Sequence, residues 1–108
     1  MHGLEFNPGD DMLSASVSKA PTVNGRIHAA ETLAKRGSLK TVNAIRDAYQ
    51  AEAHWGVRIA FARALGAGKS EHAARALCEL LGAESDVRVM QTLVTQLGRY
   101  RTQRLLKL

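Results

Sequence analysis

The feature that most constrains this chain is a register that repeats every 32 residues. Leu33, Leu65 and Leu97 stand 32 residues apart, and the ten-residue segments that end just after each of them align without a gap. Hydroxyl side chains that fit helix N-caps keep the same spacing: Ser38, Ser70 and Thr102. A fixed period of roughly 20–50 residues, built from helical patterns, is typical of stacked helical hairpins. Such stacks usually serve as scaffolds and binding surfaces.

The apolar residues of each repeat have the spacing of one helix face. In the second repeat they follow i, i+3, i+4, i+7 and i+8: Val57, Ala60, Phe61, Ala64 and Leu65. This pattern predicts an all-α fold, an α-solenoid of about two and a half two-helix repeats near residues 23–54, 55–86 and 87–108. The last repeat is truncated.

Local signals predict where the helices begin and end. Thr22 suits an N-cap, Gly37 suits the residue after a helix, and Ser38 suits the next N-cap. These residues predict helices near 23–36 and 39–52. In the third repeat we expect a break near Gly98, a loop at Arg99-Tyr100-Arg101 and a new helix at Thr102.

The first 22 residues follow a different pattern. Leu13, Ala15 and Val17 alternate with serines, and a period of two is typical of a strand. We therefore expect residues 1–22 to form a short extended segment, linker-like or strand-like, that precedes a repeat domain of residues 23–108.

The net charge of +5 gathers at one end, because residues 87–108 carry five basic residues and no acidic one. Such an end suits an anionic partner, or it is simply a solvated surface. A single cysteine, Cys78, excludes an internal disulfide. The sequence shows neither a secretory signal nor an apolar stretch of membrane-spanning length. We therefore expect a cytoplasmic protein without membrane contact.

Three single residues have structural and functional interpretations to compare. We expect Trp55 to pack on the preceding hairpin and set the angle between repeats rather than recognise a ligand. Cys78 aligns with Arg46, which predicts partial exposure, and no base stands beside it to make it a nucleophile. His28 aligns with Ala60, which predicts a packed histidine on an inner face.

Two-helix repeats of this kind resemble the HEAT-like class, although the period is shorter than the ~40–47 residues of standard HEAT repeats. Closer resemblances lie in His54–Arg58 followed by Ala62–Gly66, in Phe6–Gly9, and in Gly25–Leu33. They are similar to helix starts in the C-terminal helical region of aminopeptidase-N-type zinc peptidases and to the segment that precedes that region. One departure is the short linker at residues 21–23, where this resemblance implies an additional helix.

The resemblance implies a non-catalytic helical part of such an enzyme, which shapes access to the catalytic chamber. That family holds zinc with His-Glu-x-x-His and a downstream Glu, and binds the substrate amine with a Gly-x-Met-Glu-Asn loop. The present sequence contains none of these motifs, and its four histidines form no i, i+4 pair. We therefore expect no metal, no cofactor and no enzymatic activity.

Two other functions remain open. One is a stand-alone HEAT-like adaptor that binds a protein on its concave face. The weaker one is a nucleic-acid binder of the HEAT-like glycosylase kind, because a charge of +5 is modest and aromatic residues are few. The expected partners are a protein or peptide, including the missing catalytic domains of a parent enzyme. We also expect self-association through the truncated C-terminal end, where Leu105, Leu106 and Leu108 lack cover.

The candidate interaction site is a basic ladder formed by Lys40, His72, Arg75, Arg104 and Lys107. The 32-residue register places these residues in two neighbouring columns on the second helix of each repeat. Second helices usually line the concave side of a solenoid, where the ladder would meet a peptide carboxylate, an acidic protein or a nucleic-acid backbone. The alternative is an ordinary solvated polar face.

Overall fold

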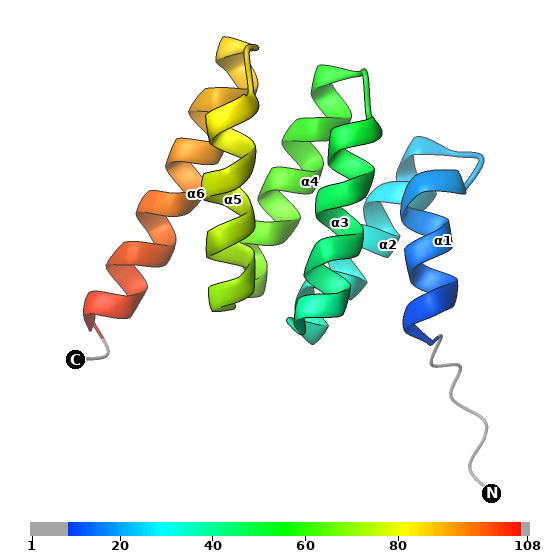
Figure 1. Cartoon of the computed structure of the whole chain (residues 1–108), viewed down its shortest axis with the longest axis horizontal. Helices are drawn as coiled ribbons and strands as arrows, with labels where there is room; N and C mark the ends of the chain where they lie inside the picture. The colour runs from blue at the N-terminus through cyan, green and yellow to red at the C-terminus, as the bar shows by residue number, and fades with distance from the viewer. Residues whose placement is uncertain (1–8, 107–108) are drawn as a thin grey trace, which may run out of the picture.

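The computed structural model describes the backbone of residues 9–106 and the side chains of residues 9–102. This part of the chain forms helices and no strand: α1 (Asp10–Lys19), α2 (Val23–Arg36), α3 (Leu39–Ala51), α4 (Trp55–Gly68), α5 (Glu71–Ala83) and α6 (Val87–Leu106). The helices stack in two layers, with α1, α3 and α5 in front in Figure 1 and α2, α4 and α6 behind them. The expected all-α solenoid is confirmed.

The predicted helix ends around the first repeat are confirmed. The side chains of Thr22, Ser38 and Ser70 each accept a hydrogen bond from a backbone N–H three residues further on. Gly37 ends α2 in the left-handed conformation, with φ 66°, which a glycine adopts without strain.

The core lies between the two layers and follows the 32-residue register. Leu33 and Leu65 have no exposed surface, and Leu97 is partly buried against the same cluster. Small residues let the helices of one layer approach closely. A Cβ atom added to Gly68 would lie only 2.6 Å from the backbone oxygen of Ala34, so α4 touches α2 directly at this point.

The extended segment expected within residues 1–22 is wrong for residues 10–19, which form α1. Leu13 and Val17 are four residues apart and buried on one helix face, while Ala15 between them is exposed. Three alternating apolar residues fit both a strand and a helix. Packing of α1 on α2 and α3 decides for the helix. Residues 1–8 lie outside the described part of the chain.

The helix α1 adds a helix in front of the predicted repeats. It packs on α2 and α3, and each helix of the described part of the chain runs antiparallel to the one before it (Figure 1). Salt bridges attach α1 further, from Asp10 Oδ1 to Arg36 Nη1 at 2.6 Å and from Asp11 Oδ1 to Lys40 Nζ at 3.0 Å. A helix beyond the predicted repeats is therefore present, and it precedes the short linker at residues 21–23.

The predicted break in the third repeat is also wrong, because α6 continues through Gly98 to Leu106. The hydroxyl of Thr102 donates to the backbone oxygen of Gly98 inside the helix, and Arg99-Tyr100-Arg101 is helical rather than a loop. A single glycine costs about 1 kcal/mol in a helix. This cost is too small to end a helix that packs along both α4 and α5.

Candidate functional site

A groove of about 640 Å³ lies on the α2–α4–α6 layer. Its floor is α4, where Ala60, Ala64 and Ala67 present only methyl groups. Longer side chains of α2 and α6 stand on either side, so the hollow results from small residues on the middle helix. We call this hollow the α4 groove.

The rim of the α4 groove carries more positive than negative charge. Lys35, Arg63 and Arg99 line it together with a single acidic residue, Glu31. All four are exposed. Within the part of the chain whose side chains are described, none of them forms a salt bridge. Three cations against one anion leave the rim with a net charge of +2 that is available to a ligand.

A buried polar side chain also lines the groove. Gln96 is only 6% exposed, although it borders both the α4 groove and an adjoining hollow of about 170 Å³ that includes Arg63. Its amide lies against Gly66, where a Cβ atom would overlap it. Gln96 aligns in the 32-residue register with Thr32 and Ala64, and this alignment contains no signal that could have identified it.

The described members of the predicted basic ladder lie on three helices, α3, α5 and α6. Lys40 lies on α3 and His72 and Arg75 lie on α5, all exposed and in the front layer of Figure 1. Arg104 belongs to α6, in the other layer, since the third repeat has no second helix in the described residues. Lys107 lies outside the described residues.

A shallower depression of about 880 Å³ between α1 and α3 includes Lys40 and Asp47. Its charges are already compensated, because Lys40 pairs with Asp11 and Asp47 with Arg46. The hydrogen bond to Asp11 raises the pKa of Lys40 above its usual value. This face therefore offers an anionic ligand less than the α4 groove does.

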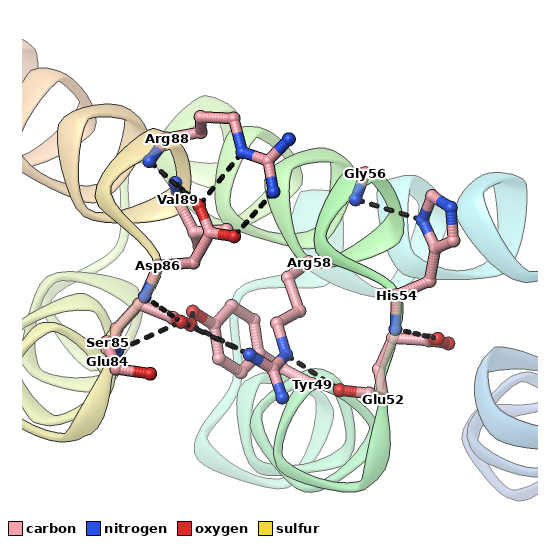
Figure 2. A network of polar contacts seen from close by, with 10 residues as sticks. All are labelled: Tyr49, Glu52, His54, Gly56, Arg58, Glu84, Ser85, Asp86, Arg88 and Val89. Atoms are coloured by element: carbon pink, nitrogen blue, oxygen red, sulfur yellow. Dashed lines mark hydrogen bonds and ion pairs between the residues drawn. The ribbon is translucent and has the colours of Figure 1, made fainter.

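A network of polar contacts joins neighbouring hairpins, as Figure 2 shows. This network was not predicted from the sequence. The guanidinium of Arg58 donates to the backbone oxygen of Glu52 at 2.7 Å and to Glu84 Oε2 at 3.1 Å. The side chain of Glu84 is 1% exposed, and it also accepts hydrogen bonds from the Tyr49 hydroxyl and from the backbone N–H groups of Ser85 and Asp86. Together these donors satisfy the hydrogen-bonding capacity of the buried carboxylate.

These contacts set the ionisation of the network. Burial by itself raises the pKa of Glu84, but the hydrogen bonds from Tyr49 and the backbone, with the charge of Arg58, outweigh it and hold that pKa below its usual value. Burial, and then the hydrogen bond to Glu84, raises the pKa of the Tyr49 phenol. At neutral pH the pair is thus a carboxylate and a neutral phenol.

The arginine contact recurs one repeat earlier. Arg26 donates to the backbone oxygen of Ala20 at 3.1 Å, and its Nε lies 4.0 Å from Glu52 Oε1. Arg26 and Arg58 are 32 residues apart, as are Glu52 and Glu84. This register was the signal in the sequence that could have revealed the network. Because it fixes one hairpin on the next and has no open position, we interpret it as structural.

Trp55 contacts the hairpin that follows it. Trp55 is 39% exposed, and the guanidinium carbon of Arg88, on α6, lies 3.7 Å from the centroid of its ring. Arg88 also binds Asp86, and this hydrogen bond lowers the pKa of Asp86 to about 2. The predicted packing of Trp55 on the preceding hairpin and its influence on the angle between repeats stay predictions.

The remaining candidates have no reactive surroundings in the described residues. His28 is exposed on the groove rim and not packed on an inner face, contrary to expectation. Cys78 is exposed, as predicted. Across residues 9–102 the side chains form no group of three His, Cys, Asp or Glu residues that could hold a metal. None of the described helices combines the length and apolarity needed to cross a bilayer.

Comparison with known protein families gives a match. The family described as HEAT repeats matches residues 11–98, which is most of the chain and includes α1 except for its first residue, Asp10. Neither the curated proteins nor the solved structures contain a significant match.

Proposed function

The chain belongs to the HEAT repeat family, and we propose that it is a non-catalytic scaffold that binds a protein or peptide segment in the α4 groove. The observation that carries this proposal is the groove itself, a hollow of about 640 Å³ with uncompensated cations and a buried amide on its wall. Its volume lies within the range of roughly 300–1,000 Å³ that is common for small-molecule and cofactor pockets, which is room for a few side chains of a peptide.

The construction of the stack supports such a role. The buried core and the Arg58–Glu84 network hold α4 between its neighbours. A rigid surface needs less ordering on binding than a mobile one, so more of the contact free energy is retained as affinity.

A more specific proposal rests on the sequence resemblance. We propose that this scaffold is a part or relative of the C-terminal helical region of an aminopeptidase-N-type zinc peptidase. The motifs at His54–Arg58 and Gly25–Leu33 support it. In that setting the groove would face peptides on their way to the catalytic chamber. The alternative is a free-standing adaptor, which uses the same groove for a protein partner.

Filling the groove tests whether it binds at all. Ala67→Trp places an indole on its exposed floor, and Ala15→Trp is the matched control on the exposed face of α1. Random peptides selected on the immobilised protein should lose binding to Ala67→Trp and keep binding to Ala15→Trp. Selected peptides that bind both variants equally would contradict the groove as the binding site.

The coding context separates the two specific roles. A neighbouring or continuous coding sequence with His-Glu-x-x-His and a downstream Glu would support the aminopeptidase relationship. A context without any such sequence would contradict that relationship and favour the free-standing adaptor.

A further inference from the structure

We propose that the α4 groove selects an extended acidic protein segment. Side-chain carboxylates of that segment bind Arg63 and Arg99, and one of its main-chain peptide groups binds the amide of Gln96. This inference rests on the proposed function, which places a protein segment in the groove, and it adds the chemistry of that segment.

The charge on the groove rim favours a ligand with carboxylates. Arg63 and Arg99 have no carboxylate partner within the described side chains, whereas Arg58 and Arg88 both do. A guanidinium binds a carboxylate through two parallel hydrogen bonds, which makes it more selective for this group than a point charge. Lys35 on the same rim adds to the positive potential, and Glu31 only partly offsets it.

The side-chain amide of Gln96 favours a ligand with peptide groups. It makes no hydrogen bond with the described residues, yet none of their fully buried side-chain polar atoms lacks a partner. The Gln96 amide must therefore meet solvent, and the hollows that it lines provide the route. A primary amide offers donors and an acceptor side by side, which complements the C=O and N–H of a peptide backbone. A bound backbone group would take the place of that solvent at the amide.

The surroundings favour a peptide over a nucleic acid. No Phe, Tyr or Trp lies among the described residues that line the groove, so bases have no aromatic surface on which to stack. Glu31 interrupts the positive rim, which disfavours a continuous phosphate backbone. An extended peptide places carboxylates only at chosen side chains and can avoid this position.

The test uses three fluorescein-labelled, acetylated decapeptides that alternate serine with glutamate, glutamine or lysine. Their affinities for the protein are measured by fluorescence anisotropy. We expect the Ser-Glu peptide to bind about tenfold or more tightly than the Ser-Gln peptide, as two charge-assisted contacts imply. The Ser-Lys peptide should bind least. Added salt should weaken Ser-Glu binding, because the rim charges are exposed and screened.

Matched variants locate the contacts. Arg63→Glu and Arg99→Glu should each weaken Ser-Glu binding by about tenfold, while Arg75→Glu, on the exposed face of α5, should leave it unchanged. Gln96→Leu should weaken the Ser-Glu and Ser-Gln peptides by the same factor, since it removes only the backbone contact. Thermal unfolding followed by circular dichroism confirms that each variant is folded.

The outcomes separate this inference from the proposed function. If Ser-Glu and Ser-Gln bind equally and Ala67→Trp abolishes both, the groove binds peptides and the acidic preference is wrong. If Ala67→Trp has no effect on binding, or if none of the peptides binds, both proposals fail. Tighter binding of an oligothymidylate of the same charge than of the Ser-Glu peptide would overturn the choice of a protein segment.

Discussion

At Gly68 a single missing methyl group decides how closely two helices pack. A Cβ atom there would lie 2.6 Å from the backbone oxygen of Ala34, and a backbone atom cannot move aside as a side chain can. We predict that Gly68→Ala lowers the free energy of unfolding by about 1–3 kcal/mol, the usual cost of overpacking. Gly82→Ala is the control, because nothing lies within 4 Å of its added methyl group. Urea unfolding of both variants gives the comparison, and equal stabilities would contradict the close contact.

The buried carboxylate of Glu84 predicts a dependence of stability on pH. Its pKa is lower in the folded chain than in the unfolded one, so its contribution is complete above an unfolded pKa of about 4.3 and is lost as the pH falls through the folded pKa. At pH 7, Glu84→Gln should cost about 1–3 kcal/mol, because the amide leaves a donor without a partner next to Arg58.

Stability measured at acid pH tests this prediction. Below about pH 4.3 the native protein should lose stability faster than Glu84→Gln does, as measured by chemical unfolding at a series of pH values. The control is Glu79→Gln, which removes an exposed ion pair with Arg46 and should change stability little. Parallel curves for the native protein and Glu84→Gln would show that Glu84 is not the group that titrates.

At the scale of the element, two glycines that look alike in sequence have opposite roles. Gly37 ends α2 with a positive φ, whereas Gly98 lies inside α6 with nothing within 4 Å of a Cβ position. We predict that Gly98→Ala stabilises the protein by about 0.5–1 kcal/mol, since alanine is the better helix former. Gly37→Ala should destabilise it by about 1 kcal/mol or more, since alanine is strained there. If Gly98→Ala instead lowered the stability, the result would support the helix break that the sequence predicted near Gly98.

At the scale of the whole molecule, the outward face of α6 has no covering helix in the described part of the chain. The register makes this visible, because Ala30 and Ala62 are fully buried while Val94, at the same position of the third repeat, is 55% exposed. Val87 is exposed beside it. Solenoids need polar ends for solubility, so this face is the surface through which we expect the chain to self-associate.

We predict a concentration-dependent increase in mass in sedimentation, which Val94→Glu should reduce. Leu39→Glu is the control, because Leu39 is equally exposed but lies on α3, away from that end. The leucines at 105, 106 and 108, which first motivated this expectation, have side chains outside the described part of the chain. A strict monomer at high concentration would contradict the prediction.

Much of the fold could be read from the sequence because its signals are local or periodic. The caps at Thr22 and Ser38 and the left-handed Gly37 satisfy or free backbone groups within a few residues, so neighbouring sequence suffices to recognise them. The spacing of Leu33, Leu65 and Leu97 reports a core that repeats with the chain. Together they indicated the helices near 23–36 and 39–52, the repeating core and a HEAT-like fold.

Three features depend on the tertiary structure: the helical state of residues 10–19, the continuity of α6 and the groove. The pattern at Leu13 and Val17 fits two periods, and burial against α2 and α3 selects one of them. Gly98 fits a helix end as well as a helix interior, and contacts with α4 and α5 select the interior. Arg63 on α4 meets Arg99 and Gln96 on α6 at one hollow because helices from different repeats pack in one layer. Contacts between distant residues depend on that packing, which no local pattern contains.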